Sequence, residues 1–188
     1  MEGLIWINEN LHGSGFFNHL VKFITALGDT AIVWIAIAIV LFCFKRTRTC
    51  GLIMLISLAI GYLINDFILK NLFARARPFE VNQEIADFIK GIGMDLPSGY
   101  SFPSGHSYAS FNCAVILLLF NKKMGFFTIP LATMIALSRV FLCVHYPTDV
   151  LVGCFLGILT AICVFVVFKR IVKARNARKR NYIRWGSK

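Results

Sequence analysis

The chain has 188 residues, of which 57% are hydrophobic and only 15% are charged, and its mean hydropathy is +0.71. Soluble domains carry about 25% charged residues, so this composition excludes an ordinary soluble domain and favours an integral membrane protein. The net charge of +11 does not indicate nucleic-acid binding, because many of the basic residues lie in a tail that directly follows an apolar run.

Apolar runs near the length of a membrane-spanning helix recur along the chain. The runs are continuous and do not alternate between apolar and polar residues, which predicts an all-α bundle instead of transmembrane strands. We predict five membrane-spanning helices, with six as the alternative count. The five lie at about residues 29–44, 51–69, 104–120, 126–144 and 147–168.

The N-terminal segment, residues 1–27, is predicted to lie at the membrane interface. Residues 1–11 mix apolar and polar side chains, as is typical of an amphipathic interfacial helix. Residues 16–27 are helical in pattern but too short to span, so we expect a second interfacial or partly re-entrant helix. His12 and His19 are interpreted as ordinary interfacial side chains. No basic stretch precedes a cleavage site, so we predict no removable signal peptide.

The charge distribution predicts the orientation of the spans. Basic residues cluster at 45–48, at 122–123 and in the tail at 169–188, whereas all nine Asp and Glu lie elsewhere. Because cytoplasmic loops carry the excess of Lys and Arg, we predict an extracytoplasmic N-terminus and a cytoplasmic C-terminus. This topology places the connector at 71–104 and the junction of the last two spans on one extracytoplasmic face.

Three positive charges are predicted at that face: Lys70, Arg77 and Arg139. The planar fork of arginine fits phosphate oxygens and lysine supplies a point charge, so the group suits an anion with two or three negative charges. The alternative is that carboxylates neutralise these cations. Asp66 stands four residues before Lys70 on a predicted helix, and Glu80 and Glu84 follow Arg77.

The tetrapeptide from Pro103 to His106 opens the third predicted span. Ser104 is a suitable N-cap, and Gly105 permits close approach to the backbone. The first N–H groups of a helix lack partners within it and attract anions, so Ser104, Gly105 and His106 are candidates for holding phosphate oxygens. For this tetrapeptide alone, a capped helix with a surface histidine is the alternative.

The third cluster lies between two apolar spans. Ionisable groups at membrane depth cost free energy and therefore indicate function. The alternative is that the Arg139 side chain snorkels to the membrane surface and that His145 and Asp149 simply belong to a loop. Pro147 suits the first turn of the last helix, and Asp149 follows His145 by four residues. A carboxylate bonded to one ring nitrogen of His145 would leave the other free to attack.

Zinc bound by His106, His145 and Asp149 is the metal alternative. Catalytic zinc sites usually contain closely spaced ligand pairs, and the sequence has none. We therefore predict no metal and no cofactor. The six cysteines form no CxxC pair and are interpreted as small buried hydrophobic residues.

Three motifs occur in order along the chain: Lys70-x6-Arg77-Pro78, Pro103-Ser-Gly-His106 and Ser138-Arg139-x5-His145-x3-Asp149. Together they resemble the three-part signature of the type 2 phosphatidic acid phosphatase (PAP2) family, which shares its site with vanadium haloperoxidases. The resemblance implies a PAP2-like bundle, which we place at residues 28–170. It does not extend to residues 1–27 or to the basic cytoplasmic tail at 171–188.

The resemblance also implies a role for each matching residue. His145 would attack phosphorus and form a phosphohistidine, Asp149 would orient His145, and His106 would protonate the leaving oxygen and then activate water. The residues expected to bind the phosphoryl oxygens are Lys70, Arg77, Ser104, Gly105 and Arg139. Arg75, inside the first motif, is assigned no catalytic role.

The expected function is hydrolysis of a lipid phosphate or diphosphate at the outer face of a bacterial cytoplasmic membrane. Candidate substrates are undecaprenyl diphosphate, phosphatidic acid and phosphatidylglycerol phosphate, and a preference for the isoprenoid rests on the resemblance alone. The expected partners are this lipid and the bilayer, and the sequence predicts no oligomeric state. The alternatives are a lipid transporter or flippase and a structural membrane protein.

Overall fold

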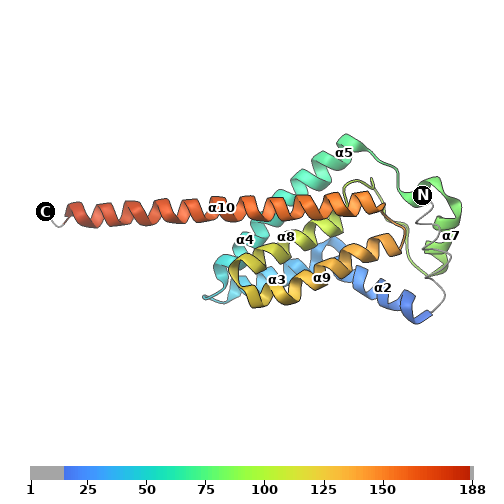
Figure 1. The fold of residues 1–188 in the computed structure, drawn as a ribbon, viewed down its shortest axis with the longest axis horizontal. Helices are drawn as coiled ribbons and strands as arrows, with labels where there is room; N and C mark the ends of the chain where they lie inside the picture. Colours follow the sequence, from blue (N-terminus) through green and yellow to red (C-terminus); the bar gives the residue numbers. More distant parts are fainter. Residues whose placement is uncertain (1–14, 187–188) are drawn as a thin grey trace.

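The computed structural model describes the backbone of residues 15–186 and the side chains of residues 15–178 (Figure 1). The predicted interfacial helix at 1–11 and His12 lie outside these residues. The described elements are α2 (Gly15–Gly28), η1 (Asp29–Ala31), α3 (Ile32–Cys43), α4 (Arg48–Gly61), η2 (Tyr62–Leu69), α5 (Lys70–Phe73), α6 (Pro78–Val81), α7 (Gln83–Gly91), α8 (Gly105–Phe120), α9 (Lys122–Phe141) and α10 (Pro147–Gly186).

The all-α prediction is confirmed, since the described residues contain helices and no strand. Four described helical stretches are long and apolar enough to cross a membrane: Gly15–Cys43, Arg48–Val81, Lys122–Phe141 and Pro147–Arg178. Helix α8 is apolar but shorter. The count of five or six spans therefore stays a prediction. All six cysteines are free. Cys50, Cys113 and Cys143 are buried as predicted, whereas Cys154 is partly exposed and Cys43 and Cys163 are exposed, so the prediction of burial is wrong for these last two.

Helix α8 is the centre of the bundle and lies between α4, α9 and α10 (Figure 1). Gly153 and Gly157 let α10 approach the backbone of α8. A Cβ at Gly153 would lie 2.6 Å from the carbonyl oxygen of Ser104, and one at Gly157 would clash with the carbonyl of Tyr108. Small residues four apart commonly allow such contact between membrane helices. The contact brings the start of α8 beside the start of α10.

Helices α2 and α3 form one apolar stretch that is kinked at η1. Thr30 and Ala31 both adopt left-handed backbone conformations, with φ of 49° and 55°. Such conformations cost non-glycine residues about 1–3 kcal/mol each and cluster at functional sites. Residues 16–27 were predicted to lie apart from the first span, whereas in the structure α2 runs directly into the kink and forms one apolar stretch with α3.

The connector between η2 and α8 folds over one end of the bundle. Ile85 and Ile89 of α7 are buried in a cluster with Val21 of α2 and with Leu142 and Val144, which precede His145. This cluster fixes the segment that carries His145. Along the bundle, many large apolar side chains are exposed, as expected of surfaces that face lipid.

Candidate active site

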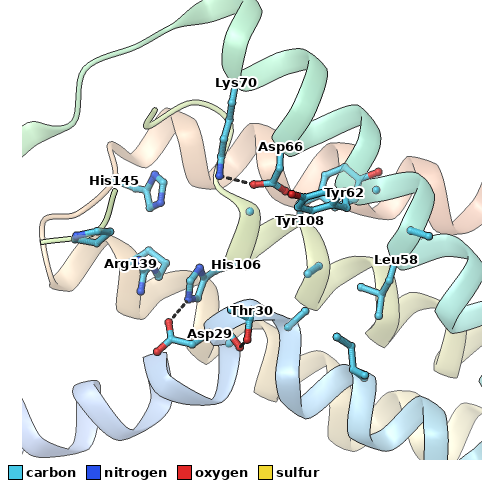
Figure 2. A pocket seen from close by; sticks show the side chains of 18 of the residues that line it. Asp29, Thr30, Leu58, Tyr62, Asp66, Lys70, His106, Tyr108, Arg139 and His145 are labelled. Carbon is cyan, nitrogen blue, oxygen red and sulfur yellow. Dashed lines mark hydrogen bonds and ion pairs between the residues drawn. The ribbon is translucent and has the colours of Figure 1, made fainter. Parts of the chain in front are cut away.

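A cavity of about 800 Å³ lies among η1, α4, η2 and the N-terminal end of α8 (Figure 2). The predicted site residues that line it are Lys70, Arg77, Gly105, His106, Arg139 and His145. The remaining two, Ser104 and Asp149, are buried. Residues far apart in the sequence therefore meet at one place.

His145 lies in the turn between α9 and α10, and its two ring nitrogens face different partners. Nδ1 is 3.6 Å from Oδ2 of Asp149 and 3.4 Å from the hydroxyl of Ser101. Nε2 is 3.2 Å from Nη1 of Arg77. Because Arg77 can only donate, this network assigns the proton to Nδ1 and a lone pair to Nε2.

Burial holds the pKa of His145 well below its usual value. The neighbouring Asp149 opposes this shift, and the positive charges of Arg139 and Arg77 add to it. His145 is therefore neutral at pH 7, and a neutral imidazole with an unprotonated Nε2 is the nucleophilic form.

Asp149 is fully buried and its two oxygens have separate partners. Oδ2 accepts hydrogen bonds from the hydroxyl of Ser101 at 2.5 Å and from the backbone N–H of Tyr146 at 2.9 Å. Oδ1 accepts from Nη1 of Arg75 at 2.6 Å. The Arg75 guanidinium also lies 3.9 Å from the centre of the Tyr146 ring. Asp149 is thus held rigidly on the Nδ1 side of His145.

Arg75 and Ser101 contact Asp149, and neither was predicted from the sequence to take part in the site. Arg75 stands inside the spacer of the first motif, but its spacing does not reveal that it contacts Asp149, 74 positions later. Ser101 lies in the connector among other small and polar residues. No sequence signal separates either residue from its neighbours.

Arg77 is 3% exposed, and backbone carbonyls hold its guanidinium. Nε donates to Gly99 at 2.8 Å, Nη1 to Val144 at 3.2 Å and Nη2 to Ser98 at 3.2 Å. Glu80 accepts a hydrogen bond from the backbone N–H of Arg77, in a capping box. Arg77 is therefore oriented toward the cavity largely by carbonyl oxygens.

Lys70 forms an ion pair with Asp66, four residues earlier, as the alternative interpretation of this motif anticipated. Both residues line the cavity (Figure 2). A Cβ added at Gly105 would lie 3.1 Å from Oδ1 of Asp66 and 3.5 Å from Nζ of Lys70. The ammonium of Lys70 thus faces the N-terminus of α8, where an anion would also meet unpaired backbone N–H groups.

Arg139 is 3% exposed and does not snorkel to the surface. It donates a hydrogen bond to the hydroxyl of Thr25 on α2. Its Nε has no hydrogen-bond partner within the described residues. A buried donor without a partner is costly, and a phosphoryl oxygen in the cavity would satisfy it.

Ser104 is the N-cap of α8, and its hydroxyl accepts hydrogen bonds from the backbone N–H and the side chain of Ser107. Its own backbone N–H donates to the carbonyl of Asp149 at 3.0 Å. Ser104 therefore joins the second and third motifs directly. Its predicted role in phosphate binding stays a prediction.

His106, on the first turn of α8, lines the same cavity as His145 (Figure 2). Its Nε2 is 2.8 Å from Oδ1 of Asp29. His106 is therefore paired with Asp29, and His145 with Asp149. Among the described residues, no three His, Cys, Asp or Glu side chains gather closely enough to hold a metal ion, so His106, His145 and Asp149 do not form the alternative zinc site.

Comparison with known proteins places this geometry in a family. The PAP2 superfamily profile matches residues 50–173. The chain belongs to the PAP2 superfamily. The match includes all three motifs and ends within α10.

Individual relatives agree with this assignment. The chain is 37% identical over 143 residues to an undecaprenyl-diphosphatase of Sulfolobus acidocaldarius, covering 74% of this chain and 65% of the relative. It is 30% identical over 163 residues to the bacitracin transport permease protein BcrC of Bacillus licheniformis, covering 85% of this chain and 76% of the relative.

A solved structure shows the same fold. The transmembrane PAP2-type phosphatidylglycerolphosphate phosphatase of Bacillus subtilis is 28% identical and superposes with a TM-score of 0.70, covering 90% of this chain and 86% of that one. Together with the apolar helices, this likeness supports a multi-pass membrane protein. The phosphatases among the relatives support a phosphoric ester hydrolase.

Proposed function

We propose that this protein hydrolyses a lipid phosphate or diphosphate through a phosphohistidine on His145, without a metal or cofactor. The observation that carries the proposal is the orientation of the His145 ring. Nδ1 faces the Asp149 and Ser101 pair, and Nε2 faces Arg77 at the cavity. A nucleophile needs this combination of a fixed tautomer and a lone pair directed at an anion site.

In the proposed first step, Nε2 of His145 attacks phosphorus as the bond to the leaving oxygen breaks. His106 donates a proton to that oxygen. In the second step His106 takes a proton from water, the water oxygen attacks phosphorus, and the bond to His145 breaks to release inorganic phosphate. Phosphoryl transfer depends chiefly on positioning and on stabilising charge on the equatorial oxygens, which we assign to Lys70, Arg77 and Arg139.

The cavity supports a lipid substrate because its apolar part adjoins its cationic end. Ile35 of α3 and Leu55, Leu58 and Ala59 of α4 line this apolar part. An apolar chain could occupy it while the phosphate meets the cations. Undecaprenyl diphosphate, phosphatidic acid and phosphatidylglycerol phosphate remain the candidates, and the name of the archaeal relative favours the first.

In the proposed orientation the protein lies in the cytoplasmic membrane. Its active site is on the extracytoplasmic face and its C-terminus is in the cytoplasm. The basic loop between α3 and α4 and the loop between α8 and α9 lie at the end of the bundle from which α10 extends (Figure 1). The active site lies toward the other end. The boundaries at 28–170 and 171–188 and the interfacial role of residues 1–27 remain part of this proposal.

A lipid transporter is the second candidate, because one relative is named as a transport permease. A transporter would move its ligand across a liposome membrane without releasing phosphate. The catalytic proposal requires phosphate release by the purified protein in detergent, where no compartment exists. Phosphate release in detergent therefore distinguishes a phosphatase from a transporter.

The test measures phosphate release from the three candidate lipids by purified protein. We expect activity with at least one of them, unaffected by a chelator and inhibited by vanadate, which mimics the trigonal-bipyramidal phosphoryl group. His145→Ala should abolish the activity, and His19→Ala, at an exposed position on α2, should retain it. Full activity in His145→Ala would refute the mechanism.

A further inference from the structure

Asp29 and His106 form a second aspartate–histidine pair at the cavity (Figure 2). Oδ1 of Asp29 lies 2.8 Å from Nε2 of His106, across a separation of 77 residues. The side chain of His106 is 18% exposed and that of Asp29 is 60% exposed. Asp29 precedes residue 50, so it lies outside both the three motifs and the region matched by the family profile.

The backbone around Asp29 is shaped to make this contact. Thr30 and Ala31, which follow it, both adopt the left-handed conformation that non-glycine residues rarely adopt. Gly28, which precedes it, lies against the His106 ring, because a Cβ there would be 2.7 Å from Cδ2 of His106. A strained turn and a close approach at neighbouring positions together point to a functional contact.

Asp29 supplies a negative charge beside His106, whose other charged neighbours in the cavity include two cations. Arg139 of α9 and Lys70 of α5 line the same cavity, and both disfavour a protonated imidazole. Asp66 of η2 pairs with Lys70. Of the carboxylates that the structure describes, Asp29 is the one in direct contact with the ring. A general acid must hold a proton when the substrate is bound, and among these neighbours Asp29 provides the charge that favours the protonated form.

We infer that Asp29 is a positioning residue that holds His106 in the orientation and protonation state of the general acid. Asp29 accepts the Nε2–H of His106 throughout the reaction. Nδ1 of His106 has no hydrogen bond within the described residues. The Nδ1 proton moves to the leaving oxygen in the first step, and Nδ1 takes a proton from water in the second, so the cycle returns His106 to its starting state.

The two pairs consequently serve different histidines. Asp149 holds the tautomer of the nucleophile His145, and Asp29 holds the proton donor His106. The inference rests on the proposed function, since it requires His106 to protonate a leaving group. It adds a residue from the segment between α2 and α3, which no motif assigns.

The experiment uses the full chain and two substrates that differ in their leaving group. A lipid alkyl phosphate releases a basic alkoxide that needs a proton, whereas p-nitrophenyl phosphate releases a phenolate that leaves without one. General acid catalysis contributes about 10²- to 10⁴-fold, so Asp29→Asn should lower kcat on the lipid by at least about 10²-fold. The same variant should lose less than about tenfold on p-nitrophenyl phosphate, and KM for the lipid should change little.

Three further variants sharpen the test. His106→Ala should show the same selective loss, and Asp29→Asn combined with His106→Ala should be no worse than His106→Ala alone, because residues that act as a unit are not additive. Asp29→Glu, which keeps the carboxylate, should recover part of the activity. Asp87→Asn, at an exposed position on α7, is the matched control and should leave both activities unchanged.

Equal losses of Asp29→Asn on both substrates would overturn the inference, because they would indicate a structural or binding role. Additive losses in the double variant would overturn it as well. Failure of the proposed function looks different, since the wild-type protein would then release phosphate from neither substrate. Size-exclusion profiles in detergent that match the wild type show that each variant is folded.

Discussion

Arg75 donates a hydrogen bond to Oδ1 of Asp149 at 2.6 Å, and the same nitrogen donates to the hydroxyl of Thr148 at 2.9 Å. The guanidinium covers the ring of Tyr146, the residue that follows the proposed nucleophile. Through this contact the connector after α5 fixes the first turn of α10. A residue without a role in the sequence motif thus determines where the carboxylate of Asp149 lies.

Arg75→Ala should therefore slow the reaction more than it weakens substrate binding. A hydrogen bond to a charged group contributes about 1.5–3 kcal/mol, and its loss from the transition state would lower kcat about 10- to 100-fold. Arg75→Lys should retain more activity because it keeps the charge. Steady-state kinetics on the preferred lipid would give kcat and KM for both variants, with Arg46→Ala, at an exposed position, as the control. A change confined to KM would contradict the positioning role.

The covalent intermediate can be observed directly. Brief reaction with a radiolabelled lipid phosphate, followed by alkaline quenching, should leave label on the wild-type protein, because phosphohistidine survives alkali and is lost in acid. His145→Ala should carry no label. His106→Ala should retain label longer than the wild type once formed, since its water attack lacks a base. Label on His145→Ala would place the nucleophile elsewhere.

The burial of His145 predicts how stability depends on pH. The pKa of His145 is lowered in the folded state, so the unfolded chain binds its proton first as the pH falls through about 6.5. Below that pH the stability contributed by neutral His145 is lost, by up to about 1.4 kcal/mol per pH unit.

Melting temperatures in detergent at pH 7.5 and pH 5 would measure this effect, using a lipid-free sample. The wild type should lose more stability between the two values than His145→Gln, which cannot take up the proton. Equal losses in the two proteins would show that His145 is not held neutral by its burial and by the positive charges of Arg77 and Arg139.

The contact of α10 with α8 should tolerate no added side chain. Gly157→Val would drive a branched side chain into the carbonyl of Tyr108 and separate the two helices. Overpacking of this kind costs about 1–3 kcal/mol, and it would also displace Asp149 from Ser104. We expect a lower melting temperature and reduced activity. Gly91→Ala is the control, because its added Cβ meets no atom within 4 Å.

The proposed orientation is tested by cysteine labelling in whole cells. In a variant whose six native cysteines are replaced, a cysteine at Glu84 on α7 should react with an impermeant reagent from outside, and one at Lys123 should react only after permeabilisation. The opposite pattern would invert the topology. Phosphatase activity of the cysteine-free background serves as the control for folding.

The sequence by itself determined the class of the protein and the residues of its three motifs. Apolar runs and helical periodicity are local properties, so the helical bundle follows from short stretches of chain. Ionisable residues in apolar surroundings are costly and therefore indicate function. On this ground the sequence alone selected the motif residues Lys70, Arg77, His106, Arg139 and His145. The structure brings these five residues to one cavity.

Only the tertiary structure decided which residues hold the motif residues in place. Arg75 with Asp149, Asp29 with His106 and Thr25 with Arg139 are separated by 74, 77 and 114 positions. The sequence spacing of such pairs carries no periodic signal, because their meeting depends on how α2, α8, α9 and α10 pack. The kink at Thr30 and Ala31 was equally hidden, since left-handed backbone is unexpected at non-glycine residues and arises where surrounding packing imposes it.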